Sequence, residues 1–379
     1  MNLPNEIEQI ILELLNLESL SWKTVRANRK RINRLKREMV QLSEDFFRRK
    51  PTEDRYPDAY FAYNFPMNLV KVMAVTKRIK IFYPLLFEKK ESLNILDVGC
   101  GEGAGMLGVY YGLGESKKTL MVGLDDSKNM LKKCYTVMSR IKEKNPALSV
   151  KLLRRKISDG LIKMKEKYDI VVLANSLAEI FPQQEIPVRF IERIFKNTSE
   201  DGLVIILEPA LRHTSRRLMK LRDILIRKEK FHILLPCLHN NICPLFELRK
   251  HKEWCHHSFF WNPPDYMKII DQELNREIKL LKFSYLVLGR EKPPDDYEND
   301  FLVVSRLLKE KGKKKCFLCT RNGRVELLRL NRFKSSLNNQ FDEIKKGDVL
   351  TIKDYIQKKP LCWRITPATQ IKIKYSLYF

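Results

Sequence analysis

The strongest constraint on the fold is a series of short apolar runs that alternate with helix-length segments. The runs are Leu93–Val98, Leu120–Leu124, Ile170–Leu173, Leu203–Leu207 and Phe283–Leu288. Because strands that alternate with helices build parallel sheets from βαβ units, this rhythm predicts an α/β domain with a Rossmann-like sheet. We expect this domain to cover residues 81–292.

The segment before this domain has a helical pattern. Apolar side chains such as Ile7, Ile10 and Leu14 recur at helical spacing within residues 4–50, and Tyr56–Arg78 resumes the pattern. Residues 1–80 are therefore predicted to form a helical, basic N-terminal region, in which Tyr56–Arg78 packs as a cap over the sheet domain.

The last part of the chain favours strands. Residues 293–296 read Pro-Pro-Asp-Asp, which is typical of a linker, and short strand candidates follow at 302–308, 315–320 and 325–330. We expect a small β-rich domain over residues 293–379. Residues 232–262 interrupt the α/β rhythm with Cys, His, Trp and Pro, and they are predicted to be an insert.

A glycine-rich turn closes the first apolar run. Gly99, Gly101 and Gly103 would let the backbone pass close to a ligand and open onto the N-terminus of a helix. Asp97 precedes the glycines, and the next run ends at Asp125, where a carboxylate would meet the ribose hydroxyls of a nucleotide cofactor.

This turn resembles the cofactor loop of class I methyltransferases, which keep an acid at the position of Asp97 for the methionine end of S-adenosylmethionine. The resemblance implies a set of cofactor-binding residues: Asp97, Gly99, Cys100, Gly101, Gly103, Asp125 and Asp159. For Asp159 an ordinary turn aspartate is the alternative. Such enzymes place acceptor-binding groups after the fourth strand, which points to Asn175 and Glu179 as catalytic, acceptor-orienting residues.

Three cysteines lie close together in the predicted insert. Cys237, Cys243 and Cys255 fall within about twenty residues that are rich in Pro and His. In a reducing compartment such grouped thiols favour zinc or an iron–sulfur cluster, and buried metal-free cysteines are the alternative. The candidates for a fourth ligand are His239, His256, His257, Cys316 and Cys319.

The formal net charge of +26 indicates a polyanionic partner. The predicted RNA-binding residues are Lys23, Arg26, Arg29, Lys30, Arg31, Arg34, Arg216 and Arg217, with Arg212, Lys220, Arg222 and residues 309–315 as further phosphate contacts. A solvated helix face is the alternative for the first group. The sequence contains no apolar run of the roughly 18 residues that cross a bilayer and no secretory signal pattern. We expect a cytoplasmic protein that does not bind membranes.

Several motifs occur together and in order: the glycine turn, Pro236-Cys through Cys243-Pro, Trp254-Cys-His, residues 282–288, and Leu318-Cys through Gly323. The set resembles the methyltransferase-like family associated with the mitochondrial small ribosomal subunit, which has bacterial and archaeal members. The likeness runs from about Tyr56 to Asp348. It implies a 4Fe–4S cluster on Cys237, Cys243, Cys255 and Cys319, and in eukaryotic relatives a mitochondrial location.

The resemblance implies a factor for small-subunit assembly or translation that binds ribosomal RNA, S-adenosylmethionine and the cluster, with ribosomal proteins as further partners. Whether such a chain transfers methyl groups stays open at this stage. The alternatives are an active RNA methyltransferase, or a methyltransferase of a protein or small molecule with a structural zinc site.

Overall fold

The computed structural model describes the chain except for residues 18–20, 48–55, 89, 115–116, 158–163, 183–184, 230, 248–252, 293–296, 298 and 377–379. The chain divides into two compact units. One consists of Met1–Ile180, Lys196–Ser199 and Phe260–Leu281, and the other of Phe181–Phe195, Glu200–Phe259 and Lys282–Phe379. The predicted domain boundary at residue 293 falls next to residues outside the described part, and it stays a prediction.

The elements up to residue 180 are α1 (Asn5–Leu14), α2 (Arg29–Phe47), α3 (Pro57–Phe82), α4 (Leu85–Glu88), β1 (Ser92–Val98), α5 (Ala104–Leu113), β2 (Lys118–Asp125), α6 (Lys128–Lys144), β3 (Leu148–Arg154), β4 (Tyr168–Ala174) and α7 (Leu177–Ile180). They are followed by α8 (Val188–Phe195), β5 (Thr198–Pro209), α9 (Arg212–Arg227), β6 (His232–Leu235), α10 (Pro244–Glu247), β7 (His257–Phe260), α11 (Asp265–Glu273) and β8 (Leu280–Gly289).

The C-terminal elements are β9 (Asp300–Val303), β10 (Leu308–Glu310), β11 (Lys313–Thr320), β12 (Gly323–Leu330), η1 (Asn331–Phe333), η2 (Ser336–Asp342), β13 (Val349–Lys353), β14 (Ile356–Lys359), β15 (Cys362–Ile365) and β16 (Gln370–Tyr375). None of the helices named in these two paragraphs combines the length and the apolar character that a bilayer crossing requires.

The first sheet confirms the predicted α/β class. Its strands are hydrogen-bonded in the order β3-β2-β1-β4-β5-β8-β6, and β7 also pairs with β8. Strand β1 runs parallel to β2 and β4, and β2 runs parallel to β3, whereas β8 is antiparallel to β5 and β6. Residues 232–262, expected as an insert, thus contribute two strands to this sheet.

The first unit depends on a close contact between α3 and α5. A Cβ on Gly108 would lie 2.6 Å from the Cβ of Val72 and 2.7 Å from the backbone oxygen of Leu69, and a Cβ on Gly112 would lie 2.5 Å from the Cβ of Thr76. The glycines therefore let the α3 backbone approach α5. The helical cap predicted over 56–78 is present and extends to Phe82.

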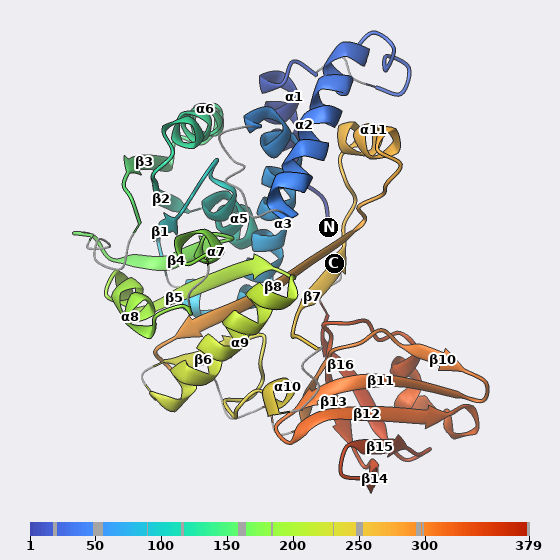
Figure 1. Cartoon of the computed structure of the whole chain (residues 1–379). Helices are drawn as coiled ribbons and strands as arrows, with labels where there is room; N and C mark the ends of the chain where they lie inside the picture. Colours follow the sequence, from blue (N-terminus) through green and yellow to red (C-terminus); the bar gives the residue numbers. More distant parts are fainter. Residues whose placement is uncertain are drawn as a thin grey trace. The chain divides into compact units, whose positions relative to one another are not determined.

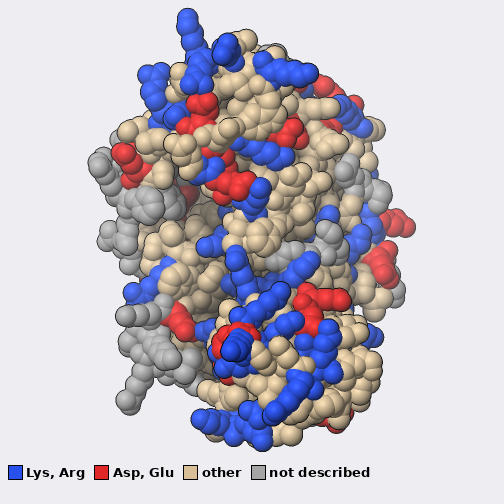
Figure 2. All heavy atoms as spheres, turned by 90° about the vertical axis from the view of Figure 1, so that its right-hand side faces the viewer, with Lys and Arg blue, Asp and Glu red and all other residues tan. Residues whose placement is uncertain are grey.

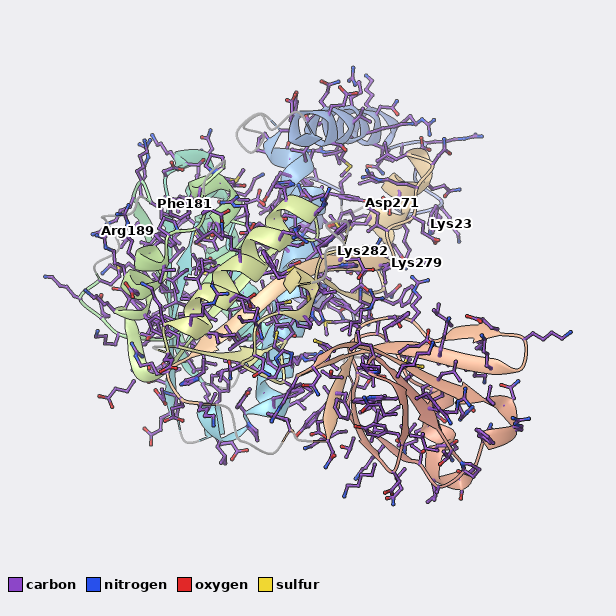
Figure 3. All side chains as sticks on the ribbon, turned by 60° about the horizontal axis from the view of Figure 1, so that its bottom comes forward. Lys23, Phe181, Arg189, Asp271, Lys279 and Lys282 are labelled. Atoms are coloured by element: carbon purple, nitrogen blue, oxygen red, sulfur yellow. The ribbon has the colours of Figure 1, made fainter. Side chains whose placement is uncertain are left out.

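The N-terminal helical stretch expected over residues 4–50 is interrupted. Helix α1 ends at Leu14, where Asn16 has a left-handed φ of 47°, and α2 begins only at Arg29. Lys23 and Arg26 therefore lie in turns before α2, and Figure 3 labels Lys23. Asp271 of α11, also labelled there, accepts hydrogen bonds from Tyr63 and Arg276.

The second sheet, orange and red in Figure 1, has the strand order β14-β15-β12-β11-β9-β13-β16, with β10 paired to β11. Alternate side chains of β11 and β12, among them Cys316, Leu318 and Leu327, are buried in its core. The strand expected over 302–308 is divided into β9 and β10. The Phe317 amide donates a hydrogen bond to the Ser305 hydroxyl at 2.8 Å, whereas in a continuous strand it would donate to a backbone oxygen.

We expect Gly108→Ala to lower the free energy of unfolding by about 1–3 kcal/mol, because the added methyl group would overpack the contact between α3 and α5. Chemical denaturation followed by circular dichroism measures the change. The control is Tyr135→Ala on the exposed face of α6, where a change of about 0.5 kcal/mol or less is expected. Equal effects for the two variants would contradict the packing argument.

Candidate functional site

The first candidate site is a pocket at the glycine loop after β1. Gly99, Gly101 and Gly103 have φ values of 76°, 51° and 93°, in the left-handed region that glycine adopts without a steric penalty. A Cβ on Gly101 would meet no atom of the described residues within 4 Å. The loop leads directly into α5, as predicted.

Asp97 is fully buried under this loop. Its Oδ2 accepts a hydrogen bond from the Met106 amide at 2.8 Å, whereas Oδ1 has no hydrogen-bond partner among the described residues. Burial is the main cause that raises the pKa of Asp97 to about 7, the nearby Asp125 carboxylate adds to it, and the Met106 hydrogen bond acts against it. A buried carboxylate oxygen without a donor favours a cationic ligand group.

Asp125 ties the end of β2 to the glycine loop. Its Oδ2 accepts a hydrogen bond from the Gly101 amide at 2.8 Å, and its Oδ1 accepts one from the Ser127 amide at 2.9 Å. Each carboxylate oxygen can accept more than one hydrogen bond, so hydroxyl groups of a ligand could still bind there. Cys100 also lines the pocket, and its hydrogen bond with Cys134 together with burial raises the pKa of its thiol well above the usual value.

The loop after β4 borders the same pocket. Asn175, Ser176 and Glu179 are among the lining residues. Asn175 has a φ of 63°, in the left-handed region, which asparagine adopts more readily than most residues with a side chain. The Ser176 backbone oxygen accepts the amides of Glu179 and Ile180 at 3.2 and 2.9 Å, which fixes the start of α7. Asp159, which was predicted to bind the cofactor, lies outside the described residues.

Part of this pocket was not predicted from the sequence. The pocket is also lined by three residues of α3 that belong to no recognised motif: Tyr60, Phe65 and Asn68. Their apolar, helical pattern predicted only a packed helix. The loop residue Glu102 also lines the pocket, and its position among the three glycines could have drawn attention to it.

The second candidate site is a pocket of about 340 Å³ within the second unit. Cys237, Cys243, Cys255 and Cys319 all line it, as do His239 and His256. Three of the cysteines come from the loops after β6, before α10 and before β7, and Cys319 comes from β11. The fold therefore brings together four thiols that span more than eighty residues of sequence.

Strand β11 separates the two candidates for a fourth cysteine. Its side chains alternate between the two faces, so Cys316 lies in the apolar core and Cys319 faces the pocket. His239 Nε2 lies 3.7 Å from Cys319 Sγ. His257 is not among the lining residues, and its ring packs 4.9 Å from that of Tyr285.

A buried arginine, Arg222 of α9, organises this second pocket. Its Nε donates to Cys237 Sγ at 3.1 Å, and its two other nitrogens donate to the backbone oxygens of Asn241 and His239 at 2.9 and 3.0 Å. Arg222 is only 2% exposed, so the expectation that it contacts RNA is wrong. It was expected at the surface because α9 carries several basic residues, but it lies on the buried face of that helix.

Burial favours the neutral form of the thiols in the second pocket. Burial raises the pKa of Cys243 to about 11, with a further contribution from Cys237, and burial also raises the pKa values of Cys255 and Cys319 well above the usual range. Among the described residues, no three His, Cys, Asp or Glu side chains are arranged so that they could hold one metal ion.

The predicted RNA-binding residues are not all equally accessible. Lys23, Arg26, Arg29, Lys30 and Arg34 are exposed, while Arg31 is half-buried. Arg29 forms an ion pair with Glu273 at 2.8 Å, and Arg34 pairs with Glu38 at 2.8 Å.

The two arginines of α9 in the predicted set make contacts within the protein. Arg216 donates to the Glu253 backbone oxygen at 3.0 Å and stacks on the ring of Phe246, and Arg217 donates to the backbone oxygen of Phe181. Figure 3 labels Phe181. An RNA contact of Arg216 or Arg217 stays a prediction.

Solved structures of several methyltransferases are similar to this chain at low identity. The plantazolicin methyltransferase BpumL, in complex with SAH, is 13% identical over 69% of this chain and 99% of its own, with a TM-score of 0.38. Magnesium protoporphyrin IX methyltransferase from Synechocystis PCC 6803, with bound SAM, is 13% identical over 60% and 85%, with a TM-score of 0.33. The ribosomal protein L11 methylase from Lactobacillus delbrueckii subsp. bulgaricus is 14% identical over 59% and 79%, with a TM-score of 0.31.

No curated protein matches the chain significantly. A family model does: it is described as mitochondrial small ribosomal subunit Rsm22, and it matches residues 56–349. The matched range includes the glycine loop, Asp125 and the four cysteines of the second pocket. This chain belongs to the family of the mitochondrial small ribosomal subunit protein Rsm22.

Proposed function

We propose that this chain is a small-subunit assembly or translation factor that binds ribosomal RNA, S-adenosylmethionine and a 4Fe–4S cluster. The observation that carries the proposal is the second oxygen of Asp97, which is buried at a glycine loop and has no donor among the described residues, in a chain of a small-subunit ribosomal family. Its net charge of +26 supports an RNA partner, and ribosomal proteins are further candidates. A cytoplasmic, ribosome-associated location stays an expectation.

In the proposed complex with S-adenosylmethionine, Asp97 Oδ1 would accept a hydrogen bond from the ammonium group of the methionine part. Asp125 would accept hydrogen bonds from the ribose hydroxyls, and the backbone of Gly99, Gly101 and Gly103 would lie against the cofactor without side chains in the way. Cys100 contributes a neutral, buried wall.

Methyl transfer, if this site carries it out, requires little acid–base chemistry because the sulfonium of the cofactor is already activated. The task of the protein is then to hold the acceptor in line with the methyl group. Asn175 and the neighbouring Glu179 border the pocket and are the residues that would orient the acceptor. An active RNA methyltransferase is therefore the second candidate function.

The support for a metal centre is that four thiols from separate segments line one pocket. Cys237, Cys243, Cys255 and Cys319 would hold the cluster, and zinc is the alternative. When bound, a 4Fe–4S cluster supplies four bonds that link these segments and a centre sensitive to oxygen.

Arg222 fits the same proposal. Its hydrogen bond to Cys237 Sγ stabilises a thiolate more than a thiol, because the guanidinium is always charged. It also holds the backbone of residues 239–241, which connects two of the proposed ligands.

We expect the affinity for S-adenosylhomocysteine to fall as the pH drops below 7. The ligand ammonium requires ionised Asp97, whose pKa is raised to about 7, so well below that pKa the affinity would fall about tenfold per pH unit. Asp97→Asn should weaken binding at pH 8 by about tenfold or more and remove this dependence. Isothermal titration calorimetry measures both, and an unchanged pH profile in Asp97→Asn would contradict the assignment.

We expect Cys319→Ser to abolish iron and sulfide binding in protein purified without oxygen, because it removes one of four thiols. Cys316→Ser is the matched control on the same strand and should keep the metal, since Cys316 lies in the core. Metal analysis and visible absorption distinguish the outcomes. A colourless protein with one zinc would support the zinc alternative, and equal metal content in both variants would exclude Cys319 as a ligand.

Ultraviolet crosslinking in cells that express the chain tests the RNA partner. We expect reads concentrated on a few helices of small-subunit ribosomal RNA. Replacing the exposed Lys23, Arg26 and Lys30 with Gln should reduce the yield of crosslinked RNA several-fold, because these side chains would contact phosphates. Reads spread evenly over cellular RNA would count against a ribosomal role.

A further inference from the structure

The second sheet contains the strand pairing of an oligonucleotide-binding barrel. Strands β9, β11 and β12 form an antiparallel meander, β9 also pairs antiparallel with β13, and β12 pairs in parallel with β15. The helical segment η2 lies between β12 and β13 in the chain. This is the connectivity of the five-stranded OB-fold, with β10, β14 and β16 as additions.

The OB-fold has a preferred binding face. Ligands lie across its second and third strands, between the loop that joins the first two strands and the loop that joins the last two. The corresponding elements here are β11 and β12, the connection 304–312 and the connection 354–361. Both connections are extended by short strands, β10 and β14.

The outer face of this sheet carries cations and aliphatic side chains side by side. The pairing places Lys315 opposite Leu328, Leu328 opposite Arg364, and Arg364 opposite Ile356, in one row across four strands. The neighbouring residues Cys316, Leu327 and Ile365 point to the other side and are fully buried. The row therefore lies on the outer face.

The connections on either side of this face also combine exposed lysines with exposed aliphatic side chains. Lys309 and Lys311 are exposed in one and Lys358 and Lys359 in the other. Large aliphatic side chains are exposed beside them: Leu308 is 40% exposed, Ile356 45% and Leu361 39%. Lysines bind phosphates, and exposed aliphatic side chains pack against the flat faces of bases.

The net positive charge of the C-terminal residues favours binding of a polyanionic partner. Residues 300–376 contain 19 Lys and Arg against 7 Asp and Glu. Lys313 and Lys315 form ion pairs with Glu310 at 2.9 Å each, and Lys315 also pairs with Glu326 at 3.3 Å, so the strands themselves are partly neutralised. Figure 2 shows Lys and Arg gathered over the lower part of the visible surface, where the C-terminal strands lie.

We propose that the outer face of β11, β12 and β15, with the connections 304–312 and 354–361, binds single-stranded RNA. The inference rests on the proposed RNA-binding function and adds the surface and the form of the RNA. A duplex would offer phosphates to the lysines but would keep its bases stacked and away from Leu308, Ile356 and Leu361. An unpaired strand offers both.

The test uses the full chain and two double variants that remove equal charge. K358Q/K359Q changes the proposed face, and K353Q/K372Q changes exposed lysines of β13 and β16, at the opposite end of the strand order. Fluorescence anisotropy follows binding of a mixed-sequence single-stranded RNA of about 16 nucleotides and of the same sequence as a duplex. Thermal unfolding of each variant checks that the fold is kept.

We expect K358Q/K359Q to weaken single-strand binding about tenfold at about 0.15 M salt, and to lower the salt slope by about 1.4, since each contact with a single-strand phosphate contributes about 0.7. The control variant should change the affinity less than about twofold. K309Q/K311Q, in the other connection, should behave like K358Q/K359Q and provides an independent second test.

The outcomes separate this inference from the proposed function. If the face variants and the control variant bound RNA with equal affinity, the proposed binding surface would be wrong. The proposed function would still stand in that case, provided that the wild type binds RNA. Binding of the duplex alone would overturn the single-stranded form. A wild-type chain that binds neither RNA would contradict both the inference and the proposed RNA-binding function.

Discussion

The cofactor pocket depends on the parallel register of three strands. Asp97 of β1 lies opposite Gly123 of β2 and Val172 of β4, so the carboxyl ends of the three strands meet at one edge of the sheet. Asp125 is the last residue of β2, and Asn175 follows β4 directly. Backbone hydrogen bonds between the strands thus decide which side chains border the pocket, and a sequence pattern that predicts the strands also predicts most of its polar lining.

The cysteine pocket is built by a different constraint, the twofold alternation of side chains along a strand. Cys316 and Cys319 are three residues apart, so they must point to opposite faces of β11. The resemblance to the family implied Cys319, and the alternation gives a physical reason for that choice. Arg222 then fixes the loop that carries Cys237, through hydrogen bonds to two backbone oxygens and one sulfur.

The sequence predicted what depends on local pattern and missed what depends on packing between distant elements. The strands of the α/β sheet, the glycine loop with Asp97 and Asp125, and a small C-terminal β region all followed from short-range patterns. The contribution of α3 to the pocket did not, because Tyr60, Phe65 and Asn68 reach it only through the packing of α3. The buried position of Arg222 was missed for the same reason, since α9 carries exposed basic residues such as Arg212 and Lys220 and the packing that buries its other face involves distant elements. The interruption before α2 was missed because basic residues are compatible with both helix and turn.

The alternation along β11 has a consequence for how this family can vary in length. One face of the strand presents Lys315 and Cys319, and the other fills the core with Cys316 and Leu318. An insertion or deletion of one residue within β11 would exchange the two faces, which would bury lysine and remove the thiol from its pocket in a single event. The connection over residues 304–312 has no such restriction. Length differences among relatives should therefore collect in that connection, and the eight residues of β11 should keep their number.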